Sequence, residues 1–206
     1  MVPAESFVPA RVRFMIGLVD INEAVQNVSE AISSVLDVDV IISDAEFRKV
    51  GDTKRHFNRE VTAIRDTYVI GHVLSTGETA TIASKADSPQ CMVCNEQAEC
   101  NLKAMICVPI EREGARVGAI GLIAITEAAR TKLLENRINL VVFTRRMADL
   151  IVSKLIEQEA AEKLTISKNR LTRIIDSIEE GIIATDAEGR IVHTNAVIEE
   201  MLGARS

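Results

Sequence analysis

Apolar and polar positions along the first part of the chain alternate between helical and extended patterns. Residues 18–36 space their apolar side chains three or four positions apart, which predicts an amphipathic helix with Asp20 near its start. The β-branched run 38–44 predicts a strand, and a second strand is expected to end at Gly51 and Asp52. Helical spacing returns over 59–76 and is followed by Gly77, as is common at helix C-termini. Residues 79–84 predict a brief third strand.

The next part of the chain combines an aperiodic stretch with two apolar strands. Residues 85–100 are mostly polar and contain Pro89, so we expect a loop. The segments AMICVPI (104–110) and RVGAIGLIAIT (116–126) flank the polar turn EREGA (111–115), which predicts an antiparallel hairpin. A helical pattern from about residue 128 to residue 163 predicts a long exit helix.

This order of elements resembles that of GAF sensory domains. The resemblance rests on VDVIISD (38–44), GHVLSTGETATI (71–82) and CVPIEREGARVGAIGLIAI (107–125), where an apolar strand with Pro109 and Ile110 precedes a charged glycine turn. It covers roughly residues 15–155 and implies an α+β fold, in which helices flank a GAF-type antiparallel sheet. None of the three segments carries a catalytic signature.

The C-terminal segment resembles the opening third of a PAS domain. Residues 167–203 predict an amphipathic helix, the strand GIIATD, a turn from Asp186 to Gly189, the strand RIVHTN and a short helix after Asn195. We therefore expect a GAF-like domain at 1–155 with a cysteine loop at 84–107, a helical signalling linker at 156–178 and a truncated start of a PAS domain at 179–206. The sequence is expected to be part of a longer protein.

The linker carries a seven-residue apolar repeat formed by Leu150, Leu164, Leu171 and Ile178, which Glu157 interrupts. Such a repeat is typical of helices that pair in a coiled coil, so we expect a parallel homodimer through the linker helix. The alternative is that Val152, Leu155 and Ile156 simply pack on their own domain.

Composition and charge narrow the functional classes. The net charge of −6 disfavours direct contact between this chain and nucleic acid, which requires clustered Lys and Arg. No apolar run approaches the ~18–20 residues of a membrane span, and the N-terminus lacks the apolar core of a secretory signal. We therefore expect a cytoplasmic protein without a membrane partner.

All four cysteines lie within one short segment, in the order Cys91, Cys94, Cys100 and Cys107. In a reducing compartment, clustered thiols are more typical of metal or redox sites than of structural disulfides. The C-x2-C pair suits adjacent corners of a tetrahedron, and two further thiols complete a set for zinc or an iron–sulfur cluster. The spacing matches neither ferredoxins nor zinc ribbons, so it leaves the metal open. A disulfide redox switch also remains open, as does a purely apolar role for Cys107.

A GAF domain with a Cys-x2-Cys loop before the Pro-Ile strand, followed by a PAS domain, resembles the sensory half of sigma-54-dependent transcriptional activators. The resemblance implies a sensor of redox state, oxygen or a small ligand, and it favours an iron–sulfur cluster, with zinc as the alternative, at Cys91, Cys94, Cys100 and Cys107. DNA and sigma-54 RNA polymerase would be contacted through domains beyond residue 206.

Two alternatives belong to other functional classes. One is a metal-free, small-molecule-binding GAF module of a sensor histidine kinase, and the other is a thiol enzyme related to the GAF-type methionine sulfoxide reductases. The glycine-containing segments lack a P-loop lysine, and no Ser/His/Asp or paired-carboxylate arrangement can be argued from the spacing. The sequence therefore predicts a sensor rather than an enzyme.

Overall fold

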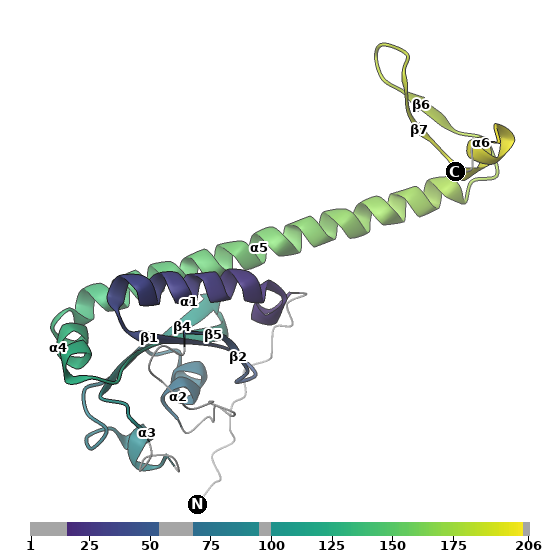
Figure 1. Ribbon diagram of the computed structural model, residues 1–206. Coiled ribbons are helices and arrows are strands. Elements are labelled where there is room, and N and C mark those ends of the chain that lie inside the picture. Colours follow the sequence, from purple (N-terminus) through teal and green to yellow (C-terminus); the bar gives the residue numbers. More distant parts are fainter. Residues whose placement is uncertain (1–15, 54–67, 95–99, 204–206) are drawn as a thin grey trace, which may run out of the picture. The chain divides into compact units, whose positions relative to one another are not determined.

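The computed structural model describes residues 16–53, 68–94 and 100–203 (Figure 1). The chain divides into two compact units, Met1–Gln158 and Glu159–Ser206. The first unit contains η1 (Leu18–Ile21), α1 (Asn22–Leu36), β1 (Asp39–Asp44), β2 (Lys49–Asp52), α2 (Val69–Thr76), β3 (Ala80–Ile82), α3 (Pro89–Met92), β4 (Ala104–Arg112), β5 (Ala115–Ala124), α4 (Glu127–Glu135) and the beginning of α5 (Arg137–Asp176). The second unit contains the end of α5 with β6 (Ile183–Thr185), β7 (Ile191–Thr194) and α6 (Ala196–Met201).

A five-stranded antiparallel sheet forms the centre of the first unit, with the strand order β2-β1-β5-β4-β3. The hairpin of β4 and β5 turns at Glu113 and Gly114, whose φ values are both positive at 52° and 79°. Two successive left-handed residues give the turn geometry that matches strand twist in a two-residue hairpin. The predicted mixed helix-and-sheet fold and this hairpin are confirmed.

Side chains alternate between two covered faces of the sheet. On the face under α1 and α5 (Figure 1), Val40 of β1 and Ile120 of β5 pack with Val25 of α1 and Leu155 of α5, and each of the four is at most 2% exposed. Full burial of such an aliphatic side chain contributes about 1.5–3 kcal/mol. The opposite face is covered by α2 and α3 and holds the candidate site.

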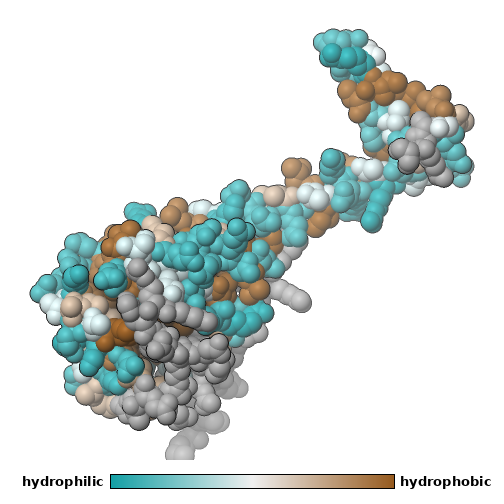
Figure 2. Space-filling view, in the orientation of Figure 1, coloured by the Kyte–Doolittle hydropathy of each residue, from teal (hydrophilic) through white to brown (hydrophobic). Residues whose placement is uncertain are grey.

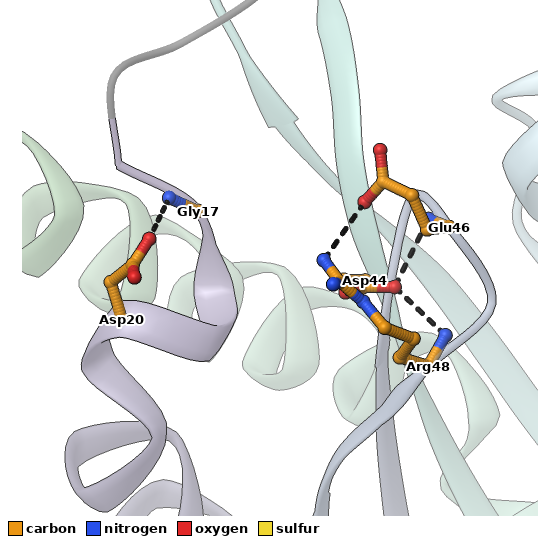
Figure 3. Close-up of polar contacts among 5 residues, drawn as sticks. All are labelled: Gly17, Asp20, Asp44, Glu46 and Arg48. Carbon is orange, nitrogen blue, oxygen red and sulfur yellow. Dashed lines mark hydrogen bonds and ion pairs between the residues drawn. The ribbon is translucent and has the colours of Figure 1, made fainter.

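The predicted helix at 18–36 forms as η1 followed directly by α1. Asp20 accepts a hydrogen bond from the Gly17 N–H at 2.8 Å, which satisfies a donor at the start of η1 (Figure 3). Of the helix predicted at 59–76, α2 forms the described end, while 59–67 lies outside the described residues. Gly77 ends α2 at φ 78°, and its N–H donates to the Val73 carbonyl, as the sequence predicts.

Two predictions of local structure are wrong. The single helix predicted at 128–163 is two helices, α4 and α5, and the second continues to Asp176. The break lies at Asn136, whose side-chain amide and backbone N–H both bond to the Lys132 carbonyl and so cap α4. The loop predicted at 85–100 contains the one-turn helix α3, because Ser88 Oγ accepts from the Cys91 N–H and Pro89 occupies the first turn.

The same five-residue turn, Asp-Ala-Glu-x-Arg, occurs in both units, at 44–48 and at 186–190. In each copy the Asp carboxylate accepts two backbone N–H groups and pairs with the Arg guanidinium, at 2.6 Å for Asp44 and Arg48 (Figure 3) and at 2.9 Å for Asp186 and Arg190. The backbone and side-chain hydrogen bonds from Arg190 hold the pKa of Asp186 below its usual value. The turn therefore closes its hairpin by local bonds alone.

The second unit is organised around Asn195, which is fully buried. Its Oδ1 accepts the N–H groups of Ile182 and Ile198, at 2.9 and 3.3 Å, and its amide donates to the Glu180 carbonyl at 2.9 Å. One side chain thus joins the start of the β6–β7 hairpin to the N-terminus of α6. The predicted order of helix, strand, turn, strand and short helix is found here.

Candidate functional site

The candidate site is the sheet face covered by α2 and α3, which we call the thiol face. Its buried members come from β1, β3, β4, β5, both helices and Leu102, and they are Ile41, Val69, Ile70, Val73, Leu74, Ile82, Cys91, Leu102, Met105, Cys107 and Ala119. Phe47, Ala80, Cys100 and Ile123 pack against them. The fold therefore places three of the four cysteines, Cys91, Cys100 and Cys107, in one packed cluster.

Cys107 lies in the middle of the sheet and is fully buried. On β4 it pairs with Gly121 of β5 on one side and Ala80 of β3 on the other. Burial raises the pKa of its thiol well above the usual range. The neutral thiol is the form that this environment favours, which opposes a role as an attacking thiolate.

The other three thiols lie on the segment between β3 and β4. Cys91 is buried in α3, and its N–H donates to the capping Ser88 at 3.3 Å. Cys94 is partly exposed just past α3, and its N–H bonds to the Cys91 carbonyl at 3.2 Å. Cys100 is partly buried, and its carbonyl accepts from Lys85 Nζ at 2.5 Å.

The four thiols have the chemistry that zinc and iron–sulfur clusters require. Their arrangement is less favourable: among the described residues, which include all four, no group of three or more Cys, His, Asp or Glu side chains is placed to share a metal ion. A metal on this set would require α3 and Cys94 to approach Cys107, together with loss of the Cys107 proton. The four cysteines therefore fit such a metal by the type of their donor atoms and not by their positions.

Sequence reasoning missed two buried polar side chains on the same face. Asp39 is 3% exposed and pairs with Ile123 on β5, and Ser43 is 0% exposed and pairs with Ala119. Paired residues of adjacent antiparallel strands point to one side of the sheet, so both side chains lie on the thiol face. Within the described part of the chain, neither carboxylate oxygen of Asp39 nor the hydroxyl of Ser43 has a hydrogen-bond partner. The available signal was two polar residues four positions apart, with only apolar residues between them.

Phe47 adds a strained backbone to this site. It occupies the fourth position of the first Asp-Ala-Glu-x-Arg turn at φ 64°, where the second copy has Gly189 at φ 80°. Left-handed backbone costs little for glycine and is unfavourable for phenylalanine. The Phe47 side chain nevertheless packs against the thiol face, and such strain is typical of ligand sites.

Two arginines connect the segments around β3 to the exit helices. Arg145 of α5 donates to Thr79 Oγ1 at 3.0 Å, just before β3, and Arg130 of α4 donates to the Ala83 carbonyl at 2.9 Å, just after it. Arg145 also lines an open groove of about 480 Å³ between Gly77, at the end of α2, and α5. The segments at both ends of β3 therefore contact α4 and α5, and α5 is the helix that continues beyond the first unit.

Comparison with family models identifies both parts of the chain. Residues 20–152 match the model described as GAF domain, and residues 169–206 match the model described as PAS fold. A search of curated protein sequences finds no match. None of the described helices has the length and apolar character that crossing a membrane requires.

Solved structures with similar folds come from proteins of different kinds. A type II free methionine-R-sulfoxide reductase from Thermoplasma acidophilum is 14% identical, with a TM-score of 0.51 over 67% of this chain and 96% of that one. Residues 122 to 287 of a methyl-accepting chemotaxis protein are 15% identical, with a TM-score of 0.52 over 70% and 93%. The Escherichia coli DhaR(N)-DhaL complex contains a chain that is 17% identical, with a TM-score of 0.52 over 90% and 63%. At these identities the likeness concerns the fold alone.

Proposed function

Because this chain belongs to the GAF domain family, we propose that its first unit is the sensory domain of a signalling protein, in which an occupant of the thiol face controls the exit helix α5. A redox or small-molecule signal fits this role. The observation that carries the proposal is the pair of arginine contacts, Arg145 with Thr79 and Arg130 with Ala83, on either side of β3.

The mechanism follows from what contacts the occupant. A ligand on the thiol face touches α2 and α3, and the segments next to these helices bond to α5 and α4. Displacement of β3 or its flanks therefore changes the contacts of Arg145 and Arg130. A ligand can shift such an equilibrium only by its difference in affinity for the two states. Typical coupling is about 1–3 kcal/mol, which biases α5 without unfolding the domain.

A second candidate is that the occupant is a metal held by Cys91, Cys94, Cys100 and Cys107, as an iron–sulfur cluster or, alternatively, as zinc. The observation in its favour is that Cys91, Cys100 and Cys107 belong to one cluster of packed residues. A cluster would supply one-electron redox chemistry to the face, whereas zinc would only hold α3 against β4. The thiol-reductase alternative is disfavoured by the buried neutral thiol of Cys107.

For the whole protein, we propose a cytoplasmic transcriptional regulator of the sigma-54-dependent type that works as a homodimer. In this proposal α5 passes the signal toward the PAS-like unit, and output domains beyond residue 206 contact DNA and sigma-54 RNA polymerase. A sensor histidine kinase with the same two sensory modules is the competing assignment.

Anaerobic purification followed by absorption spectroscopy and metal analysis separates the two occupants. A brown, iron-containing protein supports the cluster, bound zinc supports the structural metal, and a metal-free protein leaves the small-molecule sensor. Hydrogen exchange with and without the occupant then tests the mechanism. The protection of backbone amides should change in residues 84–107 and also in residues 145–165. A change confined to 84–107 contradicts control of α5.

A further inference from the structure

We propose that the thiol face binds a small molecule with a protonated amine, that Asp39 pairs with this amine, and that the apolar body of the ligand lies on Ile41, Met105 and Ile123. This inference deepens the sensory function proposed above, because it names the chemical class of the occupant. It rests on two polar side chains that are buried without partners on that face.

Burial without a partner is unfavourable for both groups. A hydroxyl or carboxyl removed from water without a compensating hydrogen bond destabilises the fold, and the destabilisation is larger when the group is charged. Almost all buried polar groups in folded proteins have a partner. Asp39 and Ser43 are 3% and 0% exposed and find none in the described part of the chain. A bound molecule is the partner that explains both.

The carboxyl group of Asp39 can accept hydrogen bonds, so its ligand must carry a hydrogen-bond donor. An ionised carboxylate bonds most strongly to a donor that is positively charged. Lys49 does not serve as the cation for Asp39. It pairs with Ser43 across β1 and β2, but its ammonium is bonded to Asp52 at 2.5 Å. Asp39 is followed along the sheet by Ile123, Met105 and Ile82, paired in turn across β5, β4 and β3. A ligand whose ammonium group pairs with Asp39 would therefore place the rest of the molecule on this row of apolar side chains.

Ser43 and Phe47 define the far end of the site. Ser43 lies four positions after Asp39 on the extended strand, a distance of about 13 Å along the backbone. Ile41 lies between them on the same face, opposite Gly121. A β-carbon at Gly121 would lie 2.5 Å from the end of Met105 and 2.9 Å from Ile41, so glycine leaves these side chains their room. The ligand class is thus an amine with an apolar body, and the Ser43 hydroxyl can bond to a second polar group of the ligand.

The test compares amines with a neutral molecule of the same shape on the whole 206-residue chain. Isopentylammonium and 1,4-diaminobutane are the probes, and 3-methylbutan-1-ol is the neutral match; binding is measured by calorimetric titration. Asp39→Asn keeps the shape and removes the charge, while Asp149→Asn makes the same change on α5, where the Asp149 side chain is 68% exposed. We expect at least one amine to bind the unmodified chain, and Asp39→Asn to weaken it by about 30-fold or more.

Each result decides the matter. Three results overturn the amine site. The first is equal binding of the amine and the alcohol, and the second is an equal loss of affinity in Asp39→Asn and Asp149→Asn. The third is no binding of either amine at ~10 mM, a concentration at which even weak fragments bind detectably. The comparison of amine with alcohol needs only the unmodified chain, so it holds even if Asp39→Asn does not fold. Hydrogen exchange of α5 separates this inference from the sensory function. Amine binding that depends on Asp39 but leaves α5 exchange unchanged supports the amine site and contradicts the sensory function. A change in α5 exchange on addition of metal or oxidant, without amine binding, supports the sensory function and contradicts the amine site.

Discussion

Replacement of Leu164 by glutamate is expected to dissociate the homodimer predicted through α5. Leu150, Leu164, Leu171 and Ile178 lie on a seven-residue repeat that Glu157 interrupts, and they are 55%, 72%, 58% and 39% exposed in the single chain. The first three lie on α5, and Ile178 follows two residues after its end. Figure 2 shows apolar residues at intervals along this helix. Leu155, by contrast, is 1% exposed and packs on its own unit, as the alternative interpretation expected, while Ile156 is 47% exposed. The helix therefore retains an apolar seam after its own domain has been packed.

The size of the effect follows from the exposed surface of Leu164. A leucine that is almost three-quarters exposed in the single chain gains about 2 kcal/mol on full burial, so its two copies contribute about 4 kcal/mol to the dimer. Glutamate loses this contribution and also buries a charge without a partner. At about 1.4 kcal/mol per factor of ten, the dissociation constant should rise roughly 1,000-fold.

Sedimentation velocity over a concentration series measures this change. Ile166→Glu is the matched control, because Ile166 is 54% exposed on the same stretch of helix but lies two residues off the seven-residue repeat. We expect the unmodified chain and Ile166→Glu to be dimers at tens of micromolar and Leu164→Glu to be a monomer. A monomeric unmodified chain, or equal effects of the two substitutions, would refute the seam.

Three further predictions address the site and its coupling. If a metal occupies the thiol face, Cys94→Ser should remove it, as measured by elemental analysis, while circular dichroism remains unchanged because Cys94 lies outside the sheet; full retention of metal contradicts the four-thiol set. Because burial raises the Cys107 pKa, the unfolded thiol ionises first, near its usual ~8.5, so the free energy of unfolding should fall above that pH by up to about 1.4 kcal/mol per unit. Urea titrations at alkaline pH should show a smaller fall in Cys107→Ala, and an unchanged slope excludes this cause. Arg145→Ala should stop the exchange response of α5 to an occupant, whereas Arg146→Ala, which removes an exposed pairing with Asp149 at 3.6 Å and no contact with Thr79 that the described residues show, should retain it. Equal responses in both variants contradict the role of Arg145.

Local sequence determined most of the elements, for physical reasons that act within a few residues. The β-branched run 38–44 predicted β1, and the polar turn at 111–115, which contains Gly114, predicted the β4–β5 hairpin. The Asp186 turn bonds to its near neighbours, so its residues identified the turn between β6 and β7. Asn195 caps α6 locally through Ile198, whereas its bonds to Ile182 and Glu180 reach back 13 and 15 residues. The sequence also indicated the family, because its apolar strands and glycines follow one another in the GAF order.

Tertiary structure decided what the elements place together. The face on which Asp39 points depends on the pairing of β1 with β5, since a shift of one residue would send it to the opposite side. Cys91, Cys100 and Cys107 belong to one packed cluster only through tertiary contacts, which no spacing of cysteines encodes. The end of α4 at Asn136 was also missed, because an asparagine within a helical pattern becomes a cap only when its amide reaches a carbonyl of the preceding turn. Contacts between distant segments, and not the local pattern, therefore define the candidate site.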